Sequence, residues 1–561
     1  MIKILKKKEG ITLSKIKILA LGGLNEDGKN MYVVNVDNDI FVFDAGLKYP
    51  KDHMLGIDYI IPSIDYLKKN IKNIKGFFIT HGHESNMGAL SDIIKDLPKI
   101  PIYASKFTCE IIKMQFEMDN IKDYHLIEIT SYKTLKFGNN SILPISVSHS
   151  IPESLCFVLN TKDGSIVYTG DFIFDPGMQG FYKMDLGKLA EVGEKGVLCL
   201  LNESLYANHL GFTSPNHRVN HFIREQLNNY PDRFIMSVLP AHIFRLQEIF
   251  DEVESTNRKI IIVGKNLTNL IHMCLRNKYL KINPLRLGNI NDINDKGAVI
   301  LISDGKEKPY ANIERIIKGN DKFIKLRDTD TIFITEPMYV GTERRMVSIM
   351  DEIAKLNINV ISLSQKKHLL EHPSREDLML MINLMKPKYY FPVKGEYKEQ
   401  YKNAFIATKC GIKKDNIILK QNGDVVTFID GNMINSFEHV DTDEILISGK
   451  SSDDIGEIVL RDREMLAESG IVIVSTTLDK ETKNILSGPF VSTRGFIYVK
   501  DNMDILKESE IIASQVVKNY LNDNENIDYN TIRYEIREKL GKYFYQETDS
   551  KPIIIVIMQE V

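Results

Sequence analysis

Apolar runs in the first part of the chain predict strands that end close to a residue able to carry chemistry. Runs with the length of buried strands occupy residues 16–20, 31–36, 40–43, 75–80, 142–147 and 165–169. Within two residues of the end of four of these runs stand Asp44, His81, His149 and Asp171. In α/β sheets functional side chains gather at strand ends, because loops converge there while the strands stay rigid. The pattern therefore predicts an α/β fold with a site at the edge of a sheet.

Strand and helix patterns alternate through the middle of the chain and then change character. Further strands are expected at 258–263, 298–303, 331–335 and 389–393, and helices at 91–97, 267–275 and 377–385. From about residue 451 we expect a small α+β domain, with strands at 458–460, 470–477, 495–499 and 553–558 and helices at 508–521 and 530–544. The boundary near residue 448 rests on a Ser/Asp/Gly-rich cluster at 448–456.

Composition narrows the class of protein. With 561 residues the chain is too long for one ordinary domain, and its 43% hydrophobic and 26% charged residues are typical of a globular protein. The five scattered cysteines include no CxxC pair, which excludes a thiolate zinc site and favours a reducing compartment. We find no signal peptide and no apolar run that would span a bilayer, so a cytoplasmic protein without a membrane segment is expected.

Charge sets a condition on any nucleic-acid partner. The formal net charge is −3, whereas proteins that neutralise many phosphates usually carry a basic excess. Any RNA path must therefore be a local groove. Since Trp is absent, base stacking would fall to Tyr and Phe.

The sequence around His81 contains the first candidate metal ligands. His81 and His83 flank Gly82 at a strand end, and two imidazoles so placed can face one cation. Such a pair alone is weak evidence, because surface histidines are common. His149 and Asp171 at later strand ends complete three imidazoles and a carboxylate, a donor set suited to zinc. Asp44 is a candidate for orienting one of these histidines without binding the metal itself.

Several motifs resemble the ribonuclease J family. The motifs lie at residues 27–32, 43–46, 55–59, 80–84, 149–152, 169–172, 380–389 and 456–463. The resemblance runs from about residue 17 to the C-terminus. It implies a metallo-β-lactamase αββα sandwich with an inserted β-CASP domain and a small α+β C-terminal domain. The implied domains are residues 10–205 (metallo-β-lactamase, first part), 206–359 (β-CASP), 360–447 (metallo-β-lactamase, second part) and 448–561 (C-terminal assembly domain).

The metal pattern of the family is incomplete in this chain. The family reads HxHxDH where residues 81–86 place Ser85 and Asn86 at the last two ligand positions, and Lys394 stands where the family has a further metal histidine. Carried over by resemblance, one metal keeps its ligands and the second keeps only Asp171, so at most one zinc ion, or none, is expected. The retained metal ligands are His81, His83, His149 and Asp171, and the catalytic residues carried over are Asp44, Asp171 and His372.

The side chain of Lys394 has two interpretations. Its ammonium stands where the second metal ion would sit, and like charges repel strongly in a partly dry site, so the lysine can take the place of that metal and pair with Asp171. Alternatively, the long side chain extends to solvent, as lysines usually do.

The residues expected to hold RNA are also altered. By resemblance, the RNA- or phosphate-binding positions are Glu203, Ser204, Arg245, His368 and His372. Between the two histidines, where the family has small residues, stand Leu370 and Glu371, and an anion there is expected to repel RNA. A further family element is altered at residues 304–308.

Three functions remain open at this stage. The first is a weakly active or inactive subunit for RNA processing and decay, which associates with an active ribonuclease J paralogue. The second is an active 5′-to-3′ exoribonuclease and endoribonuclease that uses one zinc. The third is a module that binds RNA or protein without hydrolysis. A homodimer or a hetero-oligomer is expected by resemblance only.

Overall fold

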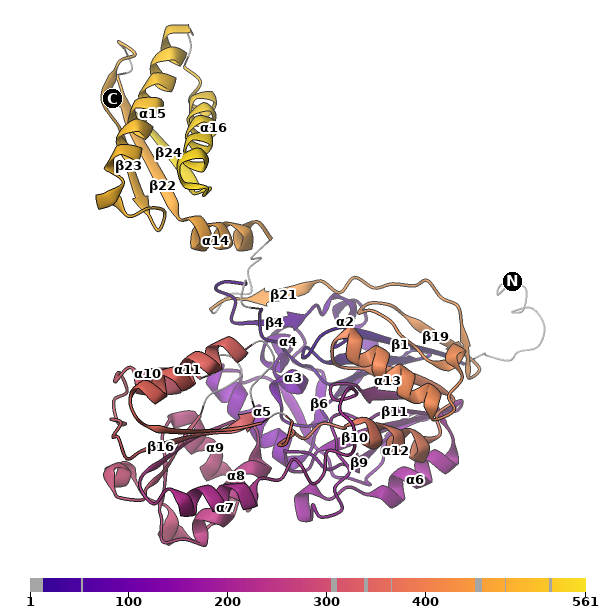
Figure 1. Ribbon diagram of the computed structural model, residues 1–561. Helices are drawn as coiled ribbons and strands as arrows, with labels where there is room; N and C mark the ends of the chain where they lie inside the picture. Colours follow the sequence, from indigo (N-terminus) through magenta and orange to yellow (C-terminus); the bar gives the residue numbers. More distant parts are fainter. Residues whose placement is uncertain are drawn as a thin grey trace, which may run out of the picture. The chain divides into compact units, whose positions relative to one another are not determined.

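The computed structural model describes residues 14–51, 54–303, 310–337, 342–364, 366–449, 457–479, 481–523 and 527–561. The chain forms two compact units (Figure 1). Unit 1 comprises Met1–Tyr49 and Tyr59–Ile445, and unit 2 comprises Pro50–Asp58 and Leu446–Val561. In the described residues we find no helix that is long and apolar enough to cross a membrane.

Unit 1 contains two facing sheets. The first has eight strands in the order β20 (Asn432–Ile434), β19 (Val426–Ile429), β1 (Lys15–Gly22), β2 (Met31–Val36), β3 (Asp39–Phe43), β5 (Ile74–Phe78), β6 (Pro101–Ala104) and β7 (His125–Glu128). The second has six in the order β18 (Tyr389–Val393), β12 (Val197–Glu203), β11 (Gly164–Tyr168), β10 (Leu155–Thr161), β9 (Asn140–Ser146) and β8 (Leu135–Phe137). One apolar core holds the two sheets together, and in it the ring centres of Phe43 from the first sheet and Phe157 from the second are 5.9 Å apart.

Helices cover the outer face of the six-stranded sheet. These are α6 (Leu186–Lys195), α12 (Arg375–Met385) and α13 (Tyr397–Lys409), whose apolar residues share a core with the sheet. Short helices α2 (Asp65–Lys69), α3 (Glu84–Met87) and α4 (Leu90–Asp96) and the longer α5 (Lys106–Met118) connect strands of the eight-stranded sheet. The predicted metallo-β-lactamase sandwich is confirmed.

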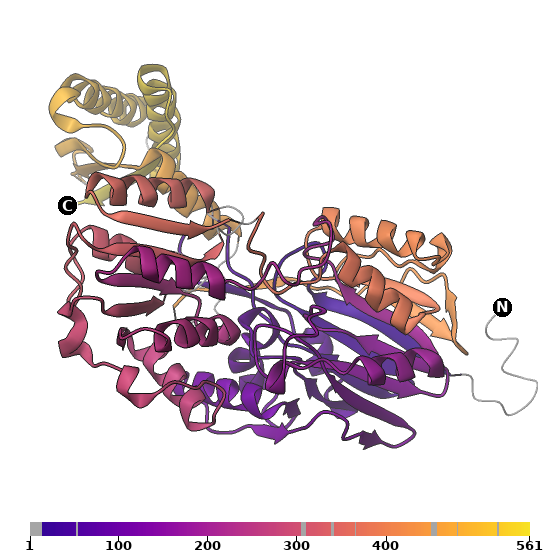
Figure 2. The same cartoon turned by 60° about the horizontal axis from the view of Figure 1, so that its bottom comes forward.

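A five-stranded parallel sheet is inserted between β12 and α12. Its order is β14 (Ile260–Ile262), β15 (Val299–Ser303), β13 (Phe234–Val238), β16 (Thr331–Pro337) and β17 (Asn359–Leu363). One face packs on α7 (Asn220–Asn229), α8 (Ile243–Glu254) and α9 (Lys265–Arg276), and the other on α10 (Ala311–Ile317) and α11 (Glu343–Lys355) (Figure 2). The predicted boundary at 359/360 falls inside β17, which pairs with β16 of this sheet.

Unit 2 is a three-stranded sheet with helices on one face. The strands run in the order β23 (Ile485–Arg494), β22 (Ile471–Leu478) and β24 (Ile553–Glu560), and α15 (Met503–Asp523) and α16 (Tyr529–Thr548) cover them. Two strand predictions are wrong. Residues 458–460 lie in α14 (Glu457–Ser469), because the short apolar run continues into helix-forming charged residues. Residues 495–497 form a bend after β23, and a short 3-10 helix, η6 (Val499–Asp501), begins at Val499.

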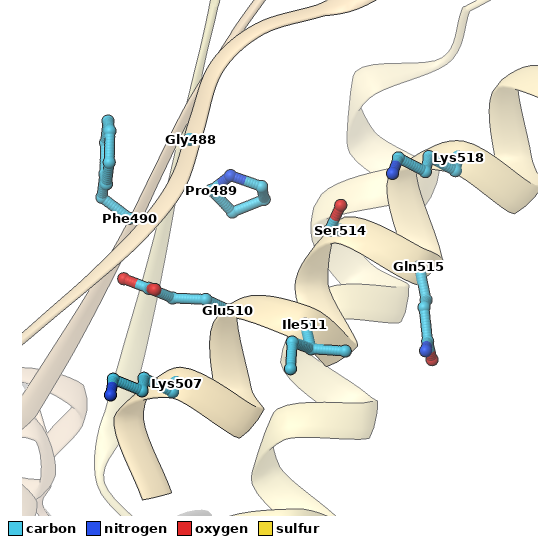
Figure 3. A pocket seen from close by; sticks show the side chains of 9 residues that line it. All are labelled: Gly488, Pro489, Phe490, Lys507, Glu510, Ile511, Ser514, Gln515 and Lys518. Carbon is cyan, nitrogen blue, oxygen red and sulfur yellow. The ribbon is translucent and has the colours of Figure 1, made fainter. Parts of the chain in front are cut away.

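A hollow of about 660 Å³ opens between β23 and α15 of unit 2 (Figure 3). Its walls mix lysines with a carboxylate and with apolar side chains, so it favours no single class of ligand. The residues that line it are Gly488, Pro489, Phe490, Lys507, Glu510, Ile511, Ser514, Gln515 and Lys518.

Candidate metal centre

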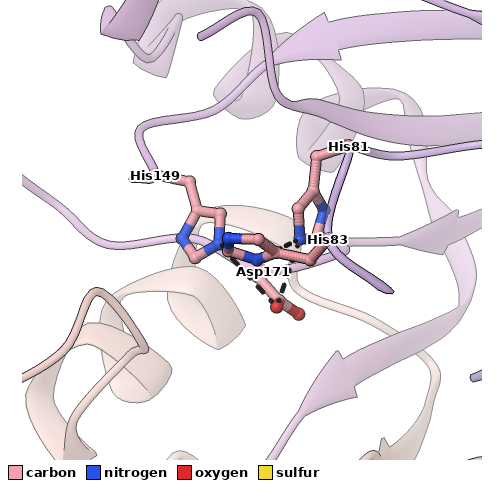
Figure 4. A group of neighbouring side chains, drawn as sticks. All are labelled: His81, His83, His149 and Asp171. Atoms are coloured by element: carbon pink, nitrogen blue, oxygen red, sulfur yellow. Dashed lines mark hydrogen bonds and ion pairs between the residues drawn. The ribbon is translucent and has the colours of Figure 1, made fainter. Parts of the chain in front are cut away.

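Four side chains from three strand ends converge in unit 1 (Figure 4). His81 and His83 follow β5, His149 follows β9 and Asp171 follows β11. His81, His149 and Asp171 are buried, and His83 is half-buried. The structure thus brings together the whole set of predicted metal ligands.

Their spacing suits one small cation. The Nδ1 atom of His83 lies 3.0 Å from Nε2 of His81 and 3.3 Å from Nε2 of His149. Oδ2 of Asp171 lies 3.5 Å from Nε2 of His81 and 3.8 Å from Nε2 of His149. Tetrahedral ligands at 2.0–2.1 Å from zinc are separated by roughly 3.3 Å. The donor atoms are therefore already spaced for a single four-coordinate ion, and these residues fit the metal.

Asp44 orients His81 through the hydroxyl of Thr80. Oγ1 of Thr80 lies 2.9 Å from both carboxylate oxygens of Asp44 and 2.9 Å from Nδ1 of His81. Because the single hydroxyl hydrogen is donated to the carboxylate, the same oxygen accepts from Nδ1 of His81. The lone pair of His81 is then on Nε2, which faces the pocket. Sequence reasoning missed Thr80, whose only signal is its place directly before the HxH pair.

Ser85 and Asn86 do not point into the metal pocket. The amide of Asn86 donates to Oδ2 of Asp44 at 2.7 Å, and the hydroxyl of Ser85 donates to Oδ1 of Asn86 at 2.8 Å. Tyr168 donates to the same Asp44 carboxylate at 2.7 Å. Burial raises the pKa of Asp44, and the donors around it act against that rise. The substituted positions therefore support Asp44 and offer no metal ligand.

Lys394 forms a buried ion pair with Asp171. Its ammonium donates to Oδ1 at 2.6 Å and to Oδ2 at 2.5 Å, and its side chain is 3% exposed. The predicted pairing is confirmed, and the alternative of a solvated lysine is wrong. Burial acts to raise the pKa of Asp171, but the ammonium of Lys394, together with His81 and His372, outweighs burial and holds that pKa well below its ordinary value. Burial acts to lower the pKa of Lys394, but the carboxylates of Asp171, Glu203 and Asp27 together outweigh burial and raise it. Both groups are charged at neutral pH.

A left-handed backbone conformation, held by two hydrogen bonds, directs the side chain of Lys394 toward Asp171. The φ of Lys394 is +59°, a left-handed conformation that costs a non-glycine residue about 1–2 kcal/mol. The amide of Lys394 donates to the carbonyl of Gly23 at 2.9 Å, and that of Gly395 donates to the carbonyl of Glu26 at 3.0 Å. The turn after β18 is therefore tied to the loop after β1, and the lysine is aimed inward.

A second group of possible ligands adjoins the first and shares Asp171. It contains Asp171, Glu203 and His372. Nδ1 of His372 lies 3.0 Å from Oε2 of Glu203 and 3.8 Å from Oδ2 of Asp171. Burial, reinforced by Asp171, raises the pKa of Glu203 to about 7. An ion in this second group would have to compete with the ammonium of Lys394 for Asp171.

Comparison with known proteins decides the family. A model of the metallo-β-lactamase superfamily matches residues 24–187, the ribonuclease J β-CASP domain matches 231–353, and the ribonuclease J C-terminal domain matches 458–561. Ribonuclease J 2 of Staphylococcus aureus is 34% identical over 550 residues, covering 97% of this chain and 98% of the relative. Ribonuclease J 2 of Staphylococcus epidermidis is 34% identical over 552 residues, with the same coverage. The chain belongs to the ribonuclease J family.

Membership brings the coarse function with it. The ribonuclease J family is a family of nucleases on a metal-binding fold, so RNA is the substrate class and a metal site is expected where the histidines gather. A crystal structure of a protein of unknown function from Enterococcus faecalis shares the fold, with a TM-score of 0.53 and 16% identity, over 74% of this chain and the whole of that one.

Glu371, in the altered ribonuclease J histidine loop, contacts two histidines that do not belong to the metal ligand set. Its side chain is buried, with Oε1 at 3.1 Å from Nε2 of His242 and 3.6 Å from Nδ1 of His217. Nε2 of His217 also lies 2.7 Å from Oδ2 of Asp175. The expectation that Glu371 would repel RNA is wrong, because its charge is enclosed by imidazoles. Sequence reasoning missed His217 and His242, which carry no motif.

The other ribonuclease J positions expected to hold phosphate divide into two groups. Arg245 is buried and donates to Glu248 and to the carbonyls of Thr335 and His217, and Ser204 donates to the carbonyl of Val393. The donor groups of Arg245 and Ser204 are thus bonded within the protein, and their contact with phosphate stays a prediction. His368 and His372 are half-buried. Residues 304–308 lie outside the described residues.

Proposed function

We propose that this ribonuclease J family member holds one zinc ion, hydrolyses RNA weakly or not at all by itself, and acts as the partner subunit of an active ribonuclease J in RNA processing and decay in the cytoplasm. The observation that carries the proposal is the buried pair of Lys394 with Asp171. Asp171 is the ligand that the family shares between two metals. Here both carboxylate oxygens of Asp171 accept from an ammonium, which cannot coordinate and activate a water as a metal ion does.

Coordination chemistry supports low activity. A bound zinc supplies a Lewis acid and, where one position is open, an activated water. Catalytic zinc sites in proteins usually have three protein ligands, whereas four protein ligands make a closed site. His81, His83, His149 and Asp171 offer four at nearly tetrahedral spacing. Two-metal hydrolysis needs a second metal ion. Here the ammonium of Lys394 supplies the positive charge at that place and occupies Asp171, the ligand that the second ion would need.

An assembly role is supported by unit 2. Alternation along β22 and β24 leaves Ile555 and Ile557 41% and 44% exposed on the sheet face opposite the helices. Phe490 of β23, 60% exposed, shares the cross-strand partner Ser475 with Ile557. An apolar face of this kind marks a protein interface. We propose that it takes part in a homodimer or in a hetero-oligomer with a paralogue.

A second candidate function is an active one-zinc ribonuclease. The contact of His372 with Glu203 favours it, because a carboxyl with a pKa near 7 beside an imidazole is suited to moving a proton at neutral pH. In this reading His81, His83, His149 and Asp171 would hold a zinc ion that supplies the activated water.

Metal analysis combined with a nuclease assay separates these functions. Purified protein is expected to contain about one zinc per chain, and His81→Ala is expected to contain almost none. With 5′-monophosphorylated RNA we expect little turnover alone, and higher turnover of an active paralogue when the two are mixed. Two metals per chain, with turnover like that of a two-metal enzyme, would overturn the proposal. Turnover that needs one zinc and is lost in His81→Ala would establish the second candidate.

A further inference from the structure

Three aromatic rings lie in a row on the exposed face of α13. Tyr397, Tyr401 and Phe405 are spaced four residues apart, which places them on one side of a helix. They are 56%, 60% and 50% exposed, and the rings of Tyr397 and Tyr401 are 6.2 Å apart. The opposite side of α13 packs against the six-stranded sheet through Ile406 and Ala407. We call the three rings the α13 stripe.

Lysines accompany the rings. The ammonium groups of Lys402 and Lys409 lie 5.6 Å and 5.2 Å from the centre of the Phe405 ring, within the range of cation–π contact. Lys398 is exposed between the two tyrosines. Among the residues that the structure describes, none of these three lysines forms an ion pair with a carboxylate. The acidic neighbours Glu396 and Glu399 stand at the start of the helix, where they form a capping box.

Aromatic rings interleaved with lysines that carry no ion pair fit single-stranded nucleic acid better than protein. Protein interfaces are enriched in Tyr and Phe but depleted in Lys. Proteins that hold single strands combine aromatic platforms for bases with positive charge for phosphates.

We propose that the α13 stripe binds a single-stranded segment of RNA, with bases on Tyr397, Tyr401 and Phe405 and phosphates on the adjacent lysines. This inference rests on the proposal that the protein binds RNA, but on neither its zinc content nor its catalytic rate. Tyr397 follows Lys394 by only three residues, so the stripe begins on the element that leads out of the metal centre.

The first test replaces the rings with leucine, which keeps helix propensity and removes the π face. Tyr397→Leu/Tyr401→Leu/Phe405→Leu is compared with the full-length protein for binding of a fluorescent single-stranded RNA. Since each stacked base contributes about 1–3 kcal/mol, the triple variant is expected to bind at least about tenfold more weakly. Tyr534→Leu, at a tyrosine 63% exposed on α16, is the matched control and is expected to bind like the parent.

The second test concerns the lysines. Lys402→Gln/Lys409→Gln is expected to reduce the slope of log affinity against log salt by about 1.4, since each phosphate contact on a single strand contributes roughly 0.7. Circular dichroism and zinc content verify that each variant is folded.

Three results would overturn the inference. They are unchanged single-strand affinity in the ring variant, a parent protein that does not bind single-stranded RNA, and a ring variant whose oligomeric mass falls while its RNA affinity holds. The last result would identify the stripe as a protein interface. Zinc content and stimulation of a paralogue, measured on the same preparations, report separately on the proposed function.

Discussion

Two positions at which the chain departs from the ribonuclease J pattern gain a charged side chain, and the two charges meet different partners. Lys394 lies in the metal pocket and neutralises the metal ligand Asp171. Glu371 is enclosed by His217 and His242, which are not metal ligands. A new charge therefore changes the electrostatics of the site in the first case and fastens a loop in the second. The difference shows that a substituted motif has no chemical meaning until the partner of each new group is known.

Rebuilding the second metal half is expected to have the largest effect. Ser85→Asp/Asn86→His/Lys394→His removes the buried ammonium and supplies the three ligands that the family pattern has at these positions. Metal content is expected to rise from one ion to two per chain, and cleavage of 5′-monophosphorylated RNA is expected to appear or increase. Mass spectrometry of metals and single-turnover cleavage check the outcome. Asn86→His alone is the control, since Lys394 would still exclude the second ion.

Removing only the ammonium tests the pair itself. In Lys394→Met the Asp171 carboxylate is left buried without its cation, so the metal-free protein is expected to lose about 3–5 kcal/mol of unfolding free energy. Zinc should restore part of the loss by binding Asp171. Urea unfolding with and without chelator measures both effects. Lys195→Met, at a lysine 70% exposed, should change stability by less than about 1 kcal/mol. An equally small effect at Lys394 would show that the pair is not formed.

The intact half of the site is tested at Thr80. Thr80→Val keeps the shape of the side chain and removes the hydroxyl that links Asp44 to His81. Zinc affinity is expected to fall about 10- to 100-fold, as for other groups that orient a metal-binding histidine. Competition with a chromophoric chelator measures the affinity. Thr108→Val, at a buried threonine of α5, should leave zinc affinity unchanged.

Local pattern was sufficient for most of the fold and for the ligands of the first metal. Residues 31–36 were predicted as a strand and form β2, because a buried strand needs a continuous apolar run. The strand predicted at residues 458–460 is wrong because a run of three apolar residues fits a helix as well as a strand. His81, His149 and Asp171 were found because each stands at a strand end.

Partners that are distant in sequence could not be predicted in the same way. His242 precedes its partner Glu371 by 129 residues, and no motif marks it. Lys394 lies 223 residues from Asp171, so only the family pattern suggested that the two would meet. Such contacts depend on how two sheets and an inserted domain pack, which the local pattern of apolar residues does not encode.

The effect expected at Glu371 is no larger than that at Thr80, and it should depend on pH. Burial acts to raise the pKa of Glu371, but the imidazoles of His217 and His242 hold that pKa well below its ordinary value. A depressed folded-state pKa means that the charge stabilises the protein above the unfolded-state pKa of about 4.3, and that this stability is lost as the pH falls. Glu371→Gln should therefore cost about 1–3 kcal/mol at neutral pH, and the difference from the parent should shrink below about pH 4.3. Urea unfolding across this range measures it, with Glu481→Gln as an exposed control. If the cost is the same at every pH, the carboxylate is not ion-paired, and hydrogen bonding alone fastens the histidine loop.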